Sequence, residues 1–302
     1  MVMPKVNIII ATRNRCTLLQ RAVESARRAG SDVEIIVVDD SSEDQTREVC
    51  QTWSDVRYIR LELRLGLGGA RNVGLIAGNA PYISFLDDDD VRLPGSIDAQ
   101  VDQLNAAPDA GMIYGRALYG DQEGRTSGSF YPEHCPQGDI FWELLRSNFI
   151  PCATVVFRRE CLTRVGLVEE QSPGVEDWDL WVRIAELYPV LATEALTAVW
   201  RRPLGTSGQF TSSPEELHCQ ARRLHRDKWL RLPRAIEAGT TRQRATARGF
   251  ADAASQQLVW EAAERLKGRH LRDFTRIALA GARMYPLGVT RKFLSASTKV
   301  AR

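Results

Sequence analysis

The sequence lacks a long hydrophobic run and any paired-cysteine motif. No stretch of about 18 apolar residues occurs among its 302 residues, so we expect no membrane-spanning helix. The six cysteines form no C-x-x-C pair, which argues against a zinc finger and predicts free thiols in a reducing compartment. The apolar run at residues 6–11 is too short for a signal peptide. These absences predict a cytoplasmic protein.

The sequence also has little net charge. Its 40 basic and 38 acidic residues leave +2 at pH 7, so we expect no attraction to nucleic acid along the whole chain and no nucleic-acid partner. The charge is unevenly distributed, however. Residues 265–302 contain ten basic residues and one acidic residue, which leaves +9 in this segment and −7 in the remainder.

Strand-like and helix-like segments alternate in the first third of the sequence. Four short apolar runs, at residues 6–11, 33–38, 57–61 and 82–86, are separated by segments with helical spacing of apolar residues. This alternation predicts an α/β fold with right-handed crossovers and a mostly parallel sheet flanked by helices. Ligands of such sheets bind at the carboxyl ends of the strands. Functional side chains are therefore expected where these runs end.

Polar residues follow three of the four runs directly. Thr12 and Arg13 follow the first, Asp39 ends the second, and residues 87–90 are four consecutive aspartates after the fourth. Carboxylates this close raise one another's pKa unless a positive charge lies among them. Oxygen ligands suit Mg²⁺ or Mn²⁺, so the aspartates indicate a metal site, with a solvated acidic loop as the alternative.

Two further motifs have both a functional and a structural interpretation. Asp39 ends a strand where a nucleoside could be bound; the alternative is a turn formed with its neighbours. A capping box at Ser42 and Gln45 predicts a helix start there. Residues 66–72 nearly match the dinucleotide fingerprint, but Arg71 occupies its third glycine position. We therefore expect Arg71 to bind a diphosphate rather than a nicotinamide cofactor; a surface arginine is the alternative.

The fourth motif, residues 174–181, places acids beside two tryptophans at a predicted helix start. Asp177 suits a general base for an acceptor hydroxyl, and the tryptophans suit contact with a sugar. The alternative is structural, because acids at a helix start are favoured by the helix dipole and Asp179 can pair with Arg183.

In this order, the motifs resemble those of glycosyltransferase family 2, which has the GT-A fold. The resemblance extends from residue 6 to about residue 202 and rests on residues 10–15, 37–42, 69–72, 85–90 and 176–181. It implies two halves: residues 1–110 as the nucleotide-sugar half and 111–205 as the acceptor half with the catalytic base. Helical spacing after the predicted helix start at residues 213–216 predicts a C-terminal helical region, residues 206–302.

The resemblance implies an inverting transfer from a nucleoside-diphosphate sugar, assisted by Mn²⁺ or Mg²⁺. It assigns the catalytic base to Asp177 and the metal ligand to Asp89. The nucleotide-sugar is implied to contact the following residues: Thr12, Arg13, Asp39, Arg71, Asp87 and Asp88.

Two positions depart from the family pattern. Arg13 stands where an aromatic residue often stacks on the base, and residues 200–203 lack the histidine that many members carry near the metal. We expect Arg202 to contact the diphosphate in its place.

The acceptor is expected to be a glycan, a lipid-linked molecule or another hydroxyl compound, which suits polysaccharide biosynthesis. Two other functions stay open: a non-catalytic nucleotide- or carbohydrate-binding module, and a nucleotidyltransferase. The basic segment 265–302 also has two interpretations. One is a helix packed on the catalytic domain with a solvated basic face; the other is peripheral contact with the inner face of a membrane.

Overall fold

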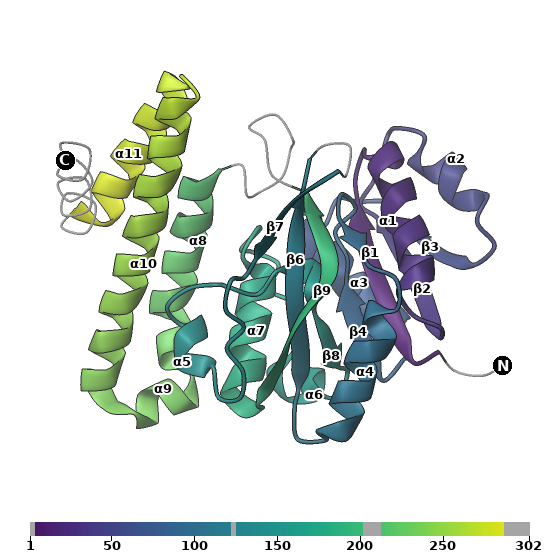
Figure 1. Ribbon diagram of the computed structural model, residues 1–302, viewed down its shortest axis with the longest axis horizontal. Helices are drawn as coiled ribbons and strands as arrows, with labels where there is room; N and C mark the ends of the chain where they lie inside the picture. Colours follow the sequence, from purple (N-terminus) through teal and green to yellow (C-terminus); the bar gives the residue numbers. More distant parts are fainter. Residues whose placement is uncertain (1–3, 122–124, 202–212, 287–302) are drawn as a thin grey trace. The chain divides into compact units, whose positions relative to one another are not determined.

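The computed structural model describes residues 4–121, 125–201 and 213–286 (Figure 1). The chain divides into two compact units. The first contains the described parts of residues 1–140 and 149–202, and the second those of residues 141–148 and 203–302.

The first unit begins with alternating strands and helices. These are β1 (Val6–Thr12), α1 (Cys16–Ala29), β2 (Val33–Asp39), α2 (Thr46–Gln51), β3 (Val56–Arg60), α3 (Gly66–Ala77), β4 (Tyr82–Phe85), β5 (Val91–Arg92) and α4 (Ser96–Ala106). The unit continues with β6 (Met112–Gly120), β7 (Thr126–Tyr131), the 3-10 helix η1 (Cys152–Thr154), β8 (Val156–Arg158), α6 (Cys161–Val165), α7 (Glu176–Leu187) and β9 (Val190–Arg201).

The strands of this unit form one nine-stranded sheet in the order β3-β2-β1-β4-β8-β6-β9-β5, with β7 paired to β6. β1 to β4 are parallel, as predicted, whereas β8 is antiparallel to both of its neighbours. Thr12 lies in register with Asp39. The amide of Leu86, just past β4, donates to the carbonyl of Ile9, 3.0 Å away. The carboxyl ends of β1, β2 and β4 therefore meet at one edge.

Helices cover both faces of the sheet, α1 and α4 on one and α3 and α7 on the other (Figure 1). Successive side chains of a strand point to opposite faces. Ile8 and Ile10 accordingly pack in the core that contains α1, while Ile9 meets α3. The helix approaches closely because residue 74 is glycine, and a Cβ there would lie only 2.4 Å from Ile9 Cγ2.

The second unit is helical. It contains α5 (Phe141–Leu144), α8 (Pro214–Asp227), the 3-10 helix η3 (Trp229–Arg231), α9 (Pro233–Glu237), α10 (Gly239–Lys267) and α11 (Leu271–Met284). Trp229 is fully buried in it, and the ring of His225 stacks on Phe250 with 4.3 Å between centroids. A C-terminal helical extension is thus present, as predicted.

Three sequence-based expectations have a direct outcome in the fold. All six cysteines are free, as predicted. None of the helices in the described ranges is long and apolar enough to cross a membrane. The capping box is wrong: α2 begins at Thr46, whose amide donates to Asp44 Oδ1 at 3.1 Å, while Ser42 Oγ accepts from the amide of Asn14.

Candidate active site

The carboxyl end of β1 is tied to the aspartates that follow β4. Thr12 Oγ1 donates to Asp88 Oδ2 at 2.8 Å, and Arg15 Nη1 donates to Asp88 Oδ1 at 2.9 Å. Burial raises the pKa of Asp88 to about 6, against the lowering effect of Arg15. Thr12 and Asp88, both assigned to the donor from the sequence, are therefore direct neighbours.

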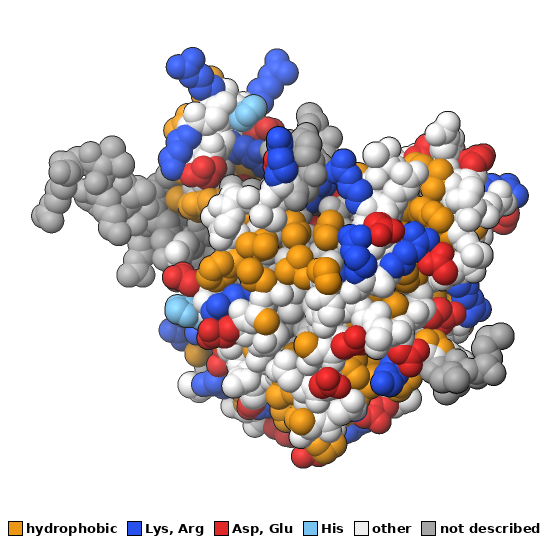
Figure 2. Space-filling model, turned by 45° about the vertical axis from the view of Figure 1, so that its right-hand side comes forward, with side chains coloured by type: hydrophobic (Ala, Val, Ile, Leu, Met, Phe, Trp, Pro, Cys, Tyr) orange, Lys and Arg blue, Asp and Glu red, His pale blue; other side chains and the backbone are white. Residues whose placement is uncertain are grey.

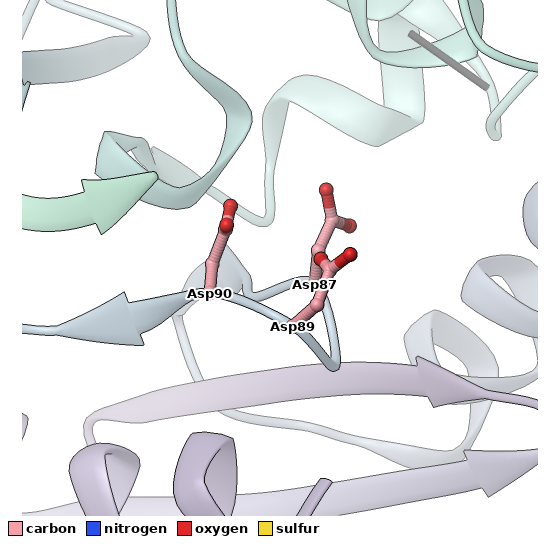
Figure 3. Close-up of side chains that lie close together, drawn as sticks. All are labelled: Asp87, Asp89 and Asp90. Atoms are coloured by element: carbon pink, nitrogen blue, oxygen red, sulfur yellow. The ribbon is translucent and has the colours of Figure 1, made fainter. Parts of the chain in front are cut away.

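The other three aspartates form a compact acidic cluster, consisting of Asp87, Asp89 and Asp90. Oxygens of all three lie within 4.8 Å of one another, and the side chains project from the loop between β4 and β5 toward the same side (Figure 3). The loop turns tightly, because the amide of Asp90 donates to the carbonyl of Asp87 at 3.1 Å. Burial and mutual repulsion raise the pKa of Asp89 and Asp90.

Two arginines that the sequence analysis did not assign hold this cluster. Arg201 Nη2 and Arg15 Nη1 donate to the same oxygen, Asp89 Oδ2, at 2.6 and 3.2 Å. The backbone amide of Arg201 also donates to Asp90 Oδ1 at 2.9 Å. Arg202, which we expected at the diphosphate, lies outside the described residues.

The donor set of the acidic cluster fits a hard divalent cation. It offers carboxylate oxygens only, which Mg²⁺ and Mn²⁺ prefer; the side chain of Asp87 is 35% exposed and that of Asp89 is 5% exposed. Mg²⁺ commonly uses one or two carboxylates together with substrate phosphates. Asp87 and Asp89 are therefore the residues that would hold such an ion. One oxygen of Asp89, Oδ2, also accepts hydrogen bonds from Arg15 and Arg201.

Arg71 is buried and connects the acidic cluster with α7. It is 2% exposed, and its Nη2 donates to Asp87 Oδ1 at 2.6 Å while Nη1 donates to Glu176 Oε1 at 2.8 Å. Burial opposes its charge, but surrounding anionic groups raise the pKa of Arg71 above its ordinary value. Both guanidinium edges are thus occupied by carboxylates, so the surface-arginine alternative is wrong.

The predicted helix of residues 176–187 is observed as α7, and its first turn carries the candidate base. Glu176 is 2% exposed and accepts from Arg71 and from the amide of Gly174. Asp177 is half-buried, and Asp177 Oδ1 accepts from the amide of Trp178 at 2.6 Å. Burial, together with the charge of Glu176, raises the pKa of Asp177 to about 7, against the lowering effect of Arg71. A carboxylate with this pKa is suited to accept a proton near neutral pH.

Asp179 and Trp181 of the same motif are fully buried. Asp179 pairs with Arg183 at 2.8 Å, as one alternative predicted. Trp181 is fully buried and its ring contacts Phe85 and Phe157. The expectation that Trp181 offers a face to a sugar is therefore wrong, and Trp178 is only 7% exposed.

Asp39 is completely buried at the end of β2. Its carboxylate accepts from the amide of Ser42 at 2.8 Å, from the Tyr58 hydroxyl at 2.6 Å and from Arg60 Nη1 at 3.0 Å. Asp40 accepts instead from two backbone amides at the start of α3, those of Leu65 and Gly66. Arg13 is half-buried just past β1, at the same edge of the sheet.

A family model described as "Glycosyl transferase family 2" matches residues 7–166. Over 134 residues the chain is 33% identical to a GalNAc(5)-diNAcBac-PP-undecaprenol beta-1,3-glucosyltransferase of Campylobacter jejuni, an alignment covering 42% of each chain. The chain also spans 33% of the length of two uncharacterized glycosyltransferases from Rickettsia felis and Rickettsia conorii. The matched region is thus well under two thirds of each of these relatives.

Solved structures give the fold. TarS of S. aureus in complex with UDP-GlcNAc has a TM-score of 0.63 at 16% identity, covering 94% of this chain and 84% of that one. The mannosyltransferase PcManGT of Pyrobaculum calidifontis, in complex with GDP-Man and Mn²⁺, has a TM-score of 0.56 at 18% identity, covering 95% and 88%. The fold is therefore the GT-A fold. Because the family model spans more than half of the residues and includes the strand ends that carry the acidic cluster, the chain belongs to glycosyltransferase family 2.

Proposed function

We propose that this protein is an inverting, divalent-metal-dependent glycosyltransferase that moves a sugar from a nucleoside-diphosphate sugar to an acceptor hydroxyl. The main observation behind the proposal is that one site contains two kinds of carboxylate. Asp177 has a pKa raised to about 7, while the acidic cluster offers oxygens that suit a metal. Arg71 connects the two, because it contacts both Asp87 and Glu176.

Asp177 acts as the general base in this proposal. Its carboxylate accepts the proton of the acceptor hydroxyl as that oxygen attacks the anomeric carbon from the side opposite the leaving diphosphate, which inverts the configuration. Glu176 does not suit this role, since both of its oxygens already accept hydrogen bonds from Arg71 and Gly174. Asp179 is engaged by Arg183 in the same way.

The acidic cluster and its two arginines lie where the leaving diphosphate is proposed to bind. When bound, Mn²⁺ or Mg²⁺ supplies positive charge to the departing nucleoside diphosphate as a Lewis acid. Asp89 and Asp87 would hold the ion, and Arg15 and Arg201 place two further positive charges at Asp89. Charges fixed before the reaction lower the barrier without reorganisation.

The nucleoside is assigned to the edge formed by β1 and β2, with Thr12, Arg13, Asp39 and Asp88 around it. Asp39 would read the base after the side chain of Arg60, which is 29% exposed, turns away from its oxygen. Arg71 would act on the nucleotide through Asp87, because it is itself buried. Residues 1–110 form the donor half in this proposal and residues 111–205 the acceptor half.

The names of the relatives support a choice of donor and acceptor class. The two solved structures contain UDP-GlcNAc and GDP-Man, and the Campylobacter relative is named for a polyprenol-diphosphate acceptor. We therefore extend to this chain a uridine or guanosine diphosphate-sugar donor and a glycan or lipid-linked acceptor, as in polysaccharide biosynthesis. We place the reaction in the cytoplasm, where segment 265–302 contacts the inner face of a membrane. Residues 287–302 of this segment lie outside the described ranges.

A panel of nucleotide-sugars tests this function. The protein with Mn²⁺ should hydrolyse or transfer the sugar of one donor class with saturation, EDTA should abolish the reaction, and NMR should show an inverted anomeric centre. Saturable binding without turnover would instead indicate a non-catalytic module. Release of pyrophosphate from a nucleoside triphosphate and a sugar phosphate would indicate a nucleotidyltransferase.

A further inference from the structure

The turn between α10 and α11 has exposed hydrophobic side chains on both of its sides. Every residue from 266 to 272 is exposed. Leu266 and Leu271, which flank the turn, are 47% and 62% exposed, and Trp260 is 52% exposed. Trp260 lies seven residues before the end of α10, or about 10 Å along a helix with a rise of 1.5 Å per residue. Large apolar side chains grouped at one end of a helical hairpin mark an interaction surface.

The same end of the hairpin is basic. Lys267, Arg269 and Arg272 are exposed, and Arg265 precedes them on α10; with Glu261 and Glu264, residues 260–272 have four basic and two acidic residues, or +2. Arg265, Arg269 and Arg272 have no ion pair with any residue in the described ranges. Lys267 pairs with Glu264, on the surface. Figure 2 shows this end at the top of the view, where Lys and Arg side chains project beside a histidine and orange hydrophobic side chains.

We propose that the basic hairpin tip, residues 260–272, binds the surface of an anionic phospholipid bilayer. Basic side chains attract anionic headgroups, while leucine side chains enter the boundary with the acyl chains and tryptophan favours the interface itself. Leu266 and Leu271 lie among the basic residues of the turn, and Trp260 precedes them on α10. It gives the membrane contact of the proposed function a defined surface, lying outside the candidate active site.

Other occupants fit this surface less well. A second copy of the chain would bring two basic tips together, and their like charges repel. Nucleic acid would satisfy the arginines through its phosphates, but would leave Leu266 and Leu271 exposed to water. An anionic bilayer satisfies both the charge and the apolar side chains.

Vesicle co-sedimentation of the full chain without donor tests the proposal. The wild-type protein should sediment with vesicles containing about one third phosphatidylglycerol, and remain in the supernatant with phosphatidylcholine alone. Arg269→Asn with Arg272→Gln should weaken binding roughly 25-fold, or about fivefold per charge removed. Asn suits position 269, where φ is +60°. Arg47→Gln, an exposed change in the first unit, should have no effect.

The apolar contribution is tested separately. Leu266→Ser with Leu271→Ser should reduce vesicle binding at least tenfold even at low salt, whereas Leu63→Ser, at a position 77% exposed in the first unit, should not. Equal binding to both vesicle types, sedimentation without vesicles, or equal losses in the control variants would each overturn the proposal. Sugar transfer to a water-soluble acceptor needs no vesicle, so failure of membrane binding is distinguishable from failure of the proposed function.

Discussion

The two units bury titratable groups in different ways. In the first unit, buried carboxylates such as Asp88 and Glu176 face guanidinium groups at 2.9 Å or less. In the second, His218 and His225 are 6% and 4% exposed, and burial lowers the pKa of each to about 4. Paired charges are costly to bury and seldom add stability, while neutral histidines act as core side chains. The first unit contains both kinds of buried pair, the structural pair of Asp179 and Arg183 and the pairs around the acidic cluster, and only the latter are proposed to serve chemistry.

Replacing the candidate base should have the largest effect. Asp177→Asn keeps the shape of the side chain but removes its basicity, so we expect kcat to fall about 10³-fold with little change in donor affinity. Single-turnover kinetics and calorimetry with the free nucleoside diphosphate separate the two. The pKa of Asp177 is higher in the folded state, so its ionisation lowers the unfolding free energy as the pH rises from about 4 to about 7, and the loss is complete above pH 7. The variant, which carries no charge there, should be more stable at pH 8 by roughly 2 kcal/mol.

A fall in kcat of less than about tenfold would make Asp177 structural. A loss of stability at pH 8 would contradict the raised pKa. Either outcome would weaken the contrast between the buried charges around the acidic cluster and the neutral histidines of the second unit.

Removing the shared carboxylate of the acidic cluster should come next. Asp89→Asn should lower turnover by at least about a hundredfold and weaken Mn²⁺ binding, because a neutral amide is a poorer ligand for a hard cation. Asp109→Asn, an exposed change in the same unit, is the matched control. Titration of Mn²⁺ by calorimetry in the presence of nucleotide measures the effect. Unchanged Mn²⁺ affinity would exclude Asp89 as a ligand.

Arg71 sharpens the comparison because it has a structural counterpart. Arg71→Met leaves Asp87 and Glu176 without their partner, and we expect a loss of about 3 kcal/mol in unfolding free energy. Arg183→Met breaks the buried pair with Asp179 and should destabilise similarly. Urea unfolding should therefore not distinguish the variants, whereas kcat at a permissive temperature should fall only for Arg71→Met. Equal activity losses would indicate that Arg71 is merely structural.

The buried histidines predict the smallest effect, an acid sensitivity of the second unit. Their pKa is lower in the folded state than the ordinary value near 6.5, so the unfolded state binds more protons between pH 6.5 and about 4. Stability should be constant above pH 6.5 and fall by on the order of 2 kcal/mol per histidine as the pH drops to about 4. Denaturation of His218→Asn and His225→Asn should show a shallower pH dependence. An unchanged slope would mean that neither histidine is buried neutral.

The parallel half of the sheet was predictable from the sequence because each strand is a nearly continuous apolar run between helical segments. β7 was missed because all but one of its residues are exposed, so it has no apolar alternation. β9 was missed because exposed residues, among them Glu194 and Leu196, interrupt its pattern. Both strands form through pairing with β6, which lies far from β9 in the sequence.

The candidate site was predictable where a local sequence motif marks its residues. The acidic cluster and Asp177 have local motifs, but Arg15 reaches Asp89 across 74 residues and Arg201 does so across 112. Such contacts depend on sheet order, which no local pattern reveals. Recognising β9 would have provided one clue, since Arg201 follows buried Val199 at a spacing of two and is itself buried.

The pH dependence of kcat/KM tests the central claim most directly. With Mn²⁺ and a soluble acceptor, log kcat/KM should rise with unit slope up to about pH 7 and level off above it, because Asp177 must be ionised to accept the proton. The residual activity of Asp177→Asn should lack this rise. A wild-type profile that is flat between pH 5 and 8, or an identical rise in the variant, would contradict the assignment of Asp177 as the catalytic base.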